Sequence, residues 1–234
     1  MSIAYFGFKY AFLTKNLLIL SKGINNHYFS SFMSSHHFVK DQQEPALLVL
    51  TDEIAATDLL PSLLEWVPLV LVTQQNVHKI MSLGIKIDGI IADKEFQDDN
   101  AILLEEQYPV FYITVEKESF LTAGLKYLLL KNHKAVNILS FDPLDSEQLN
   151  PYMLEMDIVF FNSGIRYFPA KNGKIKKWLP NCSIQVHGRE GQFVEHQSSS
   201  GADVFPITYA TFLEVEEGLQ TFSSNELFWL GTFV

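Results

Sequence analysis

The chain has 234 residues, 47% hydrophobic and 19% charged, a composition that can fill a substantial core and excludes an intrinsically disordered protein. Its 27 acidic and 17 basic residues give a formal charge of −10, which argues against nucleic-acid binding because that needs a basic surface. The single cysteine, Cys182, excludes an intrachain disulfide framework and a cysteine-based zinc site. These features predict a cytoplasmic protein of one large domain or two modest ones, and we expect two.

Residues 1–32 differ in character from the rest of the chain, because they contain lysines but no acidic residue among many apolar ones. Lys9 and Lys15 divide the apolar residues into runs too short for a membrane span, and no small-residue cleavage pattern marks a signal peptide. Export stays an alternative. We expect the functional chain to begin at Met33 and to have no membrane partner, with residues 1–44 forming an extension and lead-in.

From residue 45 onward, apolar runs alternate with helical patterns. The runs at residues 46–50 and 68–72 are short and continuously apolar, which is typical of strands buried on both faces of a parallel sheet. Leucines recur at helical spacing between these runs, and Thr57 or Asp58 can cap that helix through its side chain. The order strand, helix, strand is therefore predicted for the first part of the chain.

The alternation continues to about residue 140. Val77, Ile80 and Met81 recur at helical spacing, and Gly84 is placed to end that helix in a left-handed conformation. Further strands are predicted at residues 87–92, 108–113 and 135–139, with helices near residues 102–106 and 121–129. This pattern predicts an α/β domain at residues 45–155, with a mostly parallel sheet flanked by helices and ligands bound beyond the carboxyl ends of its strands.

After about residue 150 the helical period disappears, and short apolar runs are separated by turn residues. The runs lie at residues 158–161, 165–168, 183–186, 204–207 and 228–230. Such spacing is typical of an antiparallel sandwich, so we expect a C-terminal all-β sandwich domain at residues 156–234. Asn172-Gly173 predicts a two-residue type I′ hairpin within it.

Acidic residues cluster around the strand predicted at residues 87–92. Asp88 lies near its start, and Asp93 and Glu95 follow its end. Alternate residues of an extended chain share a side, so Asp93 and Glu95 can point together toward a hard cation such as magnesium, which would neutralise transferring phosphates. On spacing alone, a solvated acidic loop is the simpler interpretation, because short motifs often match by chance.

The order of these motifs resembles that of thiamine pyrophosphokinases. Gly84-Ile-Lys-Ile-Asp88 leads through an apolar strand into Ala92-Asp93-Lys94-Glu95-Phe96, where that family has Gly-Ile-x-Pro-Asp and then Gly-Asp-x-Asp-Ser. Lys117-Glu118 is similar to the start of the family's Lys-Asp-x-Thr-Asp motif, and Ser224-Asn225 resembles its Ser-Asn pair. The resemblance covers most of residues 33–234.

The resemblance implies an enzyme that transfers pyrophosphate from ATP to thiamine, giving thiamine diphosphate and AMP. Asp88, Asp93 and Glu95 would hold Mg²⁺, and the last two would be catalytic. The implied ligands are thiamine and ATP, in a site formed between the subunits of a homodimer.

The same resemblance assigns two further pairs of residues. Lys117 and Glu118 would lie near the nucleotide phosphates, and Ser224 and Asn225 would help to hold thiamine on the sandwich. We treat these four residues as candidate binding residues.

Several positions of the family's motifs are overwritten. Thr73-Gln74-Gln75 stands in place of Asp-Gly-Gly, and Phe120 and Leu121 replace the Thr-Asp that ends the Lys-Asp-x-Thr-Asp motif. The segment at residues 140–145 has neither the Arg nor the His of the family's Gly-x-Arg-x-Asp-His loop. These changes remove charges that stabilise a transition state, so we expect weak catalysis. The alternative is an inactive homologue that binds thiamine or a nucleotide, or that acts as a dimeric scaffold.

Overall fold

The computed structural model describes residues 44–51, 59–208 and 211–234, which all belong to one compact unit, Val39–Val234. The predictions for residues 1–32, the start at Met33 and the helix cap at Thr57 or Asp58 lie outside the described residues. None of the helices in the described part of the chain has the length and apolar composition that crossing a membrane requires.

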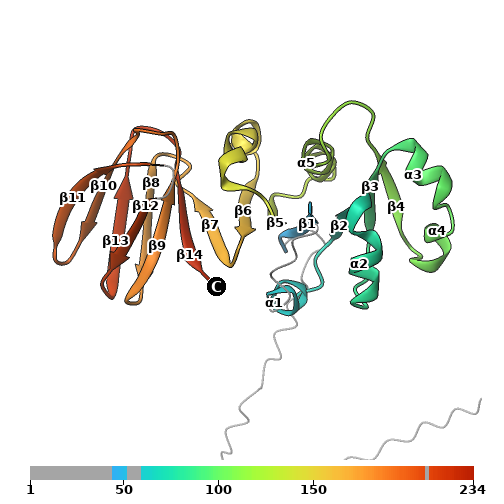
Figure 1. The fold of residues 1–234 in the computed structure, drawn as a ribbon, viewed down its shortest axis with the longest axis horizontal. Coiled ribbons are helices and arrows are strands. Elements are labelled where there is room, and N and C mark those ends of the chain that lie inside the picture. Colours follow the sequence, from blue (N-terminus) through green and yellow to red (C-terminus); the bar gives the residue numbers. More distant parts are fainter. Residues whose placement is uncertain (1–43, 52–58, 209–210) are drawn as a thin grey trace, which may run out of the picture. The chain divides into compact units, whose positions relative to one another are not determined.

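Six strands form a parallel sheet in the order β6-β5-β1-β2-β3-β4 (Figure 1). Their bounds are β1 Ala46–Val49, β2 Val70–Thr73, β3 Gly89–Ala92, β4 Phe111–Thr114, β5 Ala135–Leu139 and β6 Asp157–Asn162. β1, β2 and β3 are buried at every position, as their continuous apolar sequences predict for central strands. The chain fills the sheet outward from β1 to β4 and then returns to place β5 and β6 on the other side of β1.

Helices cover both faces of this sheet, which confirms the predicted α/β arrangement. One core is shared with α5 and the 3₁₀ helix η2, and the core on the other face is shared with α1, α2 and α4. The bounds are α1 Leu60–Leu64, η1 Gln74–Asn76, α2 Val77–Ser82, α3 Lys94–Asp99, α4 Leu103–Glu106, α5 Phe120–Leu130 and η2 Pro143–Tyr152. Gly84 follows α2 with a φ of +71°, the left-handed conformation predicted for it.

The second half of the described chain is a β-sandwich. β7 Ile165–Pro169, β14 Trp229–Phe233, β9 Cys182–His187 and β12 Thr211–Val215 pair antiparallel and extend the first sheet beyond β6, so that it has ten strands. A separate antiparallel sheet has the order β11-β10-β13-β8, with β8 Lys174–Leu179, β10 Phe193–Ser198, β11 Gly201–Pro206 and β13 Gly218–Ser223. Apolar side chains from both sheets share a third core, as predicted for a sandwich.

The sandwich is continuous with the α/β sheet, because β6 is parallel to β5 and antiparallel to β7. The division into domains at residues 45–155 and 156–234 stays a prediction.

The turn prediction at Asn172-Gly173 is wrong. The strands on its two sides, β7 and β8, belong to different sheets, and the turn runs from Ala170 to Gly173, whose amide donates to the Ala170 carbonyl at 2.8 Å. A two-residue hairpin occurs instead at Ser163-Gly164 between β6 and β7, where the φ angles of +47° and +76° are those of a type I′ turn.

Candidate functional site

The carboxyl ends of the parallel strands meet at one edge of the sheet, and the motifs singled out in the sequence lie along it. Thr73 ends β2, Asp93 follows β3, and residues 140–145 follow β5. Strand order reverses between β1 and β5, and this switch point is where open α/β sheets bind ligands.

Asp93 has an extended backbone, but α3 begins directly after it, so the alternation predicted for Asp93 and Glu95 is wrong at this point. Asp93 is the N-cap of α3, and its Oδ1 accepts a hydrogen bond from the Phe96 amide at 2.8 Å. Its Oδ2 accepts from the side-chain amide of Gln74 at 2.8 Å, and the Gln74 Oε1 accepts from the Asp93 amide at 2.8 Å. We call this reciprocal pair the Gln74–Asp93 clasp.

The clasp occupies both oxygens of the Asp93 carboxylate with donors from the protein. The Phe96 amide, followed by Gln74, lowers the pKa of Asp93 below its usual range, because these donors stabilise the ionised form. A cation at Asp93 would have to share these two oxygens with the hydrogen-bond donors or displace the donors.

Asp88 and Glu95 do not converge with Asp93. Asp88 precedes β3 and Asp93 follows it, so five residues at about 3.3 Å each place the two backbones roughly 16 Å apart. The Asp88 carboxylate accepts from the Val70 amide at 2.8 Å, while Glu95 is exposed in the first turn of α3. Within the described ranges, no group of three or more His, Cys, Asp or Glu side chains is placed to hold a metal ion.

Thr73, at the position of a missing family acid, is completely buried and joins two strand ends. Its hydroxyl donates to the Leu50 carbonyl at 2.9 Å and accepts from the Asn76 side-chain amide at 2.9 Å. The end of β2 therefore has a threonine hydroxyl whose hydrogen bonds are made within the protein. The acid that the family has at this position could have bound a cation instead.

Lys117 and Glu118 lie between β4 and α5. Lys117 is exposed, whereas Glu118 is half-buried and forms an ion pair with Lys126 of α5. The hydrogen bond from Lys126 to Glu118 raises the pKa of that lysine. The charge of Glu118 is therefore used mainly within its own segment, and neither candidate residue lines the two cavities described next.

A cavity of about 630 Å³ lies at the switch point, and we call it the switch cavity. It is lined by the ends of β1, β5 and β6 and by the first turn of α5, including Phe120 and Leu121 at the overwritten motif positions. Among the described residues, its charged lining residues are Asp142 and Asp145, and no described Lys or Arg lines it. Phosphate groups would meet negative charge there without a cationic side chain to balance them.

Ser224 and Asn225 lie after β13, where Ser224 has a structural role. Its hydroxyl donates to the Phe193 carbonyl at 2.7 Å and accepts from the Gln192 side chain at 2.9 Å. Asn225 is exposed, and the next two residues, Glu226 and Leu227, line a second cavity.

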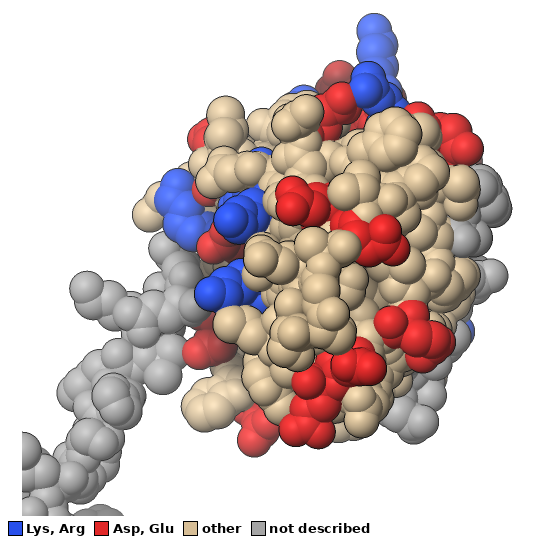
Figure 2. Space-filling model, turned by 90° about the vertical axis from the view of Figure 1, so that its left-hand side faces the viewer, with Lys and Arg blue, Asp and Glu red and all other residues tan. Residues whose placement is uncertain are grey.

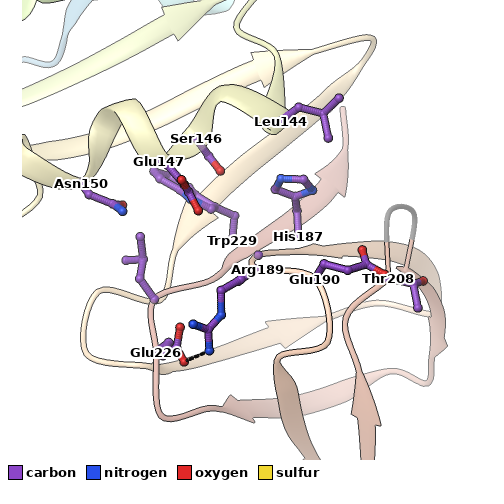
Figure 3. Close-up of a pocket in the computed structure, with 12 residues that line it drawn as sticks. Leu144, Ser146, Glu147, Asn150, His187, Arg189, Glu190, Thr208, Glu226 and Trp229 are labelled. Atoms are coloured by element: carbon purple, nitrogen blue, oxygen red, sulfur yellow. Dashed lines mark hydrogen bonds and ion pairs between the residues drawn. The ribbon is translucent and has the colours of Figure 1, made fainter.

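The second cavity has a volume of about 540 Å³ and is enclosed by η2 and the sandwich; we call it the sandwich cavity (Figure 3). Among its lining residues, η2 contributes Glu147 and Asn150, and the strands and turns of the sandwich contribute His187, Arg189 and Trp229. Trp229 is only 1% exposed and forms part of the wall.

The charges that line the sandwich cavity are mainly negative. Glu147, Glu190 and Glu226 line it together with one described Arg or Lys side chain, Arg189, which already forms an ion pair with Glu226 (Figure 3). Burial lowers the pKa of His187, although the backbone of Pro143 and the Asp142 charge oppose that shift, so His187 is mostly neutral near pH 7.

Sequence reasoning missed the sandwich cavity. Its lining comes from three separate segments, around residues 144–150, 187–190 and 226–229. None of these three segments carries a sequence motif that points to the other two. Their contact depends on η2 packing near β9 and β14, and no local pattern records such packing.

A parallel α/β sheet that continues into a β-sandwich defines a known class of folds. Among solved structures, it is similar to thiamin pyrophosphokinase from Candida albicans, with a TM-score of 0.60 and 8% identity over 83% of this chain and 90% of that chain. Thiamin pyrophosphokinase from Geobacillus thermodenitrificans matches with a TM-score of 0.58 and 11% identity over 81% and 96% of the two chains. The enzyme from Bacillus subtilis gives 0.56 and 12% over 81% and 98%.

These matches confirm the predicted resemblance at the level of the fold, and at such identities they establish the fold alone. No family model matches the sequence, and no curated protein is significantly similar to it. The Mg²⁺ and ATP that the resemblance implies do not fit the described residues, because the clasp engages Asp93 and no basic residue lines the switch cavity.

Proposed function

We propose that this chain binds thiamine, or a closely related cationic heteroaromatic compound, and does not transfer pyrophosphate. The main support for this proposal is the Gln74–Asp93 clasp. A phosphate-bound magnesium ion would need the Asp93 carboxylate as a ligand, but both of its oxygens already accept hydrogen bonds from the protein. Phosphoryl transfer depends on positive charge around the phosphates. Loss of that charge removes the largest source of transition-state stabilisation.

The charge of the cavities supports thiamine over a nucleotide. In the part of the chain that the structure describes, both charged residues lining the switch cavity are acidic, and the sandwich cavity has three carboxylates and one guanidinium. A triphosphate would be repelled by either lining. The thiazolium ring of thiamine is a cation and would be attracted by both.

The sandwich cavity is the better of the two for this ligand. Its volume of about 540 Å³ lies within the range of small-molecule sites, roughly 300–1,000 Å³. Trp229 offers an aromatic wall, and Glu147 and Glu190 supply negative charge. The cavity also adjoins Ser224 and Asn225, which resemble the family's thiamine-binding pair. The homodimer implied by the resemblance stays part of this proposal.

Two measurements on the purified full chain test the two halves of the proposal. Calorimetric titration with thiamine is expected to give saturable binding, and AMP release with Mg²⁺, ATP and thiamine is expected to equal a no-protein blank. Absence of thiamine binding at millimolar concentration would contradict the binding half. AMP release that disappears in Asp93→Asn would contradict the loss of transfer.

Glu147→Gln locates the ligand, because it removes one cavity carboxylate without changing the side-chain shape. We expect thiamine affinity to fall by roughly 2–5-fold, the effect of one exposed charge interaction. Glu155→Gln is the matched control, since Glu155 is an exposed residue of the same connection and does not line the cavity. Equal losses in both variants would place the ligand elsewhere.

A further inference from the structure

Two basic side chains share one aromatic ring where β7 and β8 approach each other. Arg166 and Phe168 lie two residues apart on β7 and so project from the same face of the sheet. The guanidinium carbon of Arg166 is 4.7 Å from the Phe168 ring centroid and 5.6 Å from that of Phe161. The Nζ of Lys177, on β8, is 3.3 Å from the Phe168 ring centroid.

These two cations have no anionic partner among the described residues. Neither forms an ion pair there, and the Nε of Arg166 is buried without a hydrogen-bond partner. Burial lowers the pKa of Arg166, and burial followed by the charge of Arg166 lowers that of Lys177. The chain has a net charge of −10, yet among the described residues no carboxylate pairs with the neighbouring, half-buried side chains of Arg166 and Lys177.

Such an arrangement is costly unless an anion completes it. Contact with the Phe168 ring offsets part of the desolvation of each cation but does nothing to reduce their mutual repulsion. Stacking also uses only the face of the guanidinium, so its N–H donors at the edge stay directed away from the ring. A group with two negative charges and several acceptor oxygens would neutralise both side chains.

We propose that Arg166 and Lys177 together bind a phosphate-type oxyanion, either free phosphate or the phosphate group of a small molecule. A phosphate monoester carries a charge close to −2 at pH 7, which matches the two cations, and its oxygens suit bidentate binding by a guanidinium.

The site is separate from the sandwich cavity. Arg166 and Tyr167 are adjacent on β7 and point to opposite faces of the sheet. Tyr167 stacks on Phe160, whose ring lies 4.7 Å from that of the cavity residue Trp229. The proposals of an anion site and of a thiamine site can therefore be tested independently of each other.

Non-specific attraction of anions must be separated from this site. Figure 2 shows one face of the molecule, on which basic side chains lie at the left and at the top while acidic ones are spread over the whole face. Lys176 is next to Lys177 on β8 but is exposed and projects to the opposite side of the strand. Lys176→Met is therefore the control for Lys177→Met, because it removes the same charge from the neighbouring position of the same strand.

The test is calorimetric titration of the full chain with inorganic phosphate and, separately, with glycerol phosphate, at an ionic strength held constant with NaCl. Saturable binding to one site is expected. Lys177→Met and Arg166→Gln should each weaken it by about tenfold or more, and Lys176→Met by less than about twofold. Tighter binding of the monoester would identify a small-molecule phosphate, and equal binding would identify free phosphate.

Three results would overturn the proposal: no saturable binding by the unmodified chain, unchanged binding in Lys177→Met, or equal loss in Lys176→Met. Because Arg166 is half-buried, Arg166→Lys serves as a second variant that keeps the charge but lacks the bidentate edge. It should weaken binding less than Arg166→Gln does. Thiamine titration of Lys177→Met should match that of the unmodified chain.

Discussion

Asp93 illustrates how a partner distant in sequence decides what a carboxylate does. The residue follows a buried strand and has the acidic neighbours of a metal site. Gln74, 19 residues earlier, binds both its side chain and its backbone, while Phe96 completes the helix cap. The carboxylate thereby ties the ends of β2 and β3 together, and its charge stabilises the fold at this edge of the sheet.

Asp93→Asn tests this role through the pH dependence of stability. The donors to Asp93 place its pKa in the folded chain below the unfolded value of about 3.9, so its stabilising effect is present above that pH and is lost as the pH falls through the folded pKa. Asn still caps the helix but does not ionise. We expect the urea midpoint of the variant to fall less steeply than that of the unmodified chain below about pH 4.

Asp99→Asn is the control, because Asp99 is exposed at the end of the same helix. It should keep the acid slope of the unmodified chain. Identical slopes for Asp93→Asn and the unmodified chain would show that the clasp does not depend on an ionised carboxylate.

At the scale of elements, periodicity predicted most helices and strands, whereas turn chemistry was less reliable. Asn172-Gly173 has the strongest sequence signal for a hairpin, yet it lies in a connection that crosses from one sheet to the other. Ser163-Gly164 has a weaker signal and forms the type I′ turn. A dipeptide records which φ angles are available, but the pairing of the flanking strands decides which turn forms.

Gly173→Ala should disturb the loop that carries Ser224 and Asn225. Gly173 has a φ of +66°, and an added Cβ would lie 2.1 Å from the Ser224 carbonyl oxygen. Its own carbonyl also accepts from the Ser224 amide at 2.7 Å. We expect a loss of unfolding free energy greater than the roughly 1–2 kcal/mol that the left-handed φ alone costs a residue with a Cβ.

Gly191→Ala measures that φ cost by itself. Gly191 has a φ of +77°, and an added Cβ would meet nothing within 4 Å. Chemical unfolding of both variants gives the comparison. Equal losses would mean that the Ser224 loop moves aside without cost.

At the scale of the whole molecule, one ten-stranded sheet joins the α/β half to the sandwich, and Trp229 lies on that connection. It belongs to the core shared by α5, η2 and β6, although its strand, β14, is part of the sandwich. The same side chain lines the sandwich cavity. If the sandwich cavity binds thiamine as proposed, stability and ligand binding are coupled at this residue.

Trp229→Ala is expected to lower the unfolding free energy by about 3–5 kcal/mol and to weaken thiamine binding, because it removes a buried indole and one wall of the cavity. Trp178→Ala is the control: Trp178 is 58% exposed, so the loss should stay within about 0.5 kcal/mol. Urea unfolding and thiamine titration measure the two effects. Normal thiamine affinity in a folded Trp229→Ala protein would contradict the assigned cavity.

The sequence alone determined the fold class, because continuous apolar runs, helical spacing and Gly84 report local burial and backbone conformation, which short-range patterns encode. The geometry of the candidate site was decided by the tertiary structure. Whether Asp93 faces a cation or Gln74 depends on the pairing of β2 with β3, and the sandwich cavity exists only because η2 packs near β9 and β14. Contacts between residues far apart in the chain set the chemistry of these side chains, and no local period specifies them.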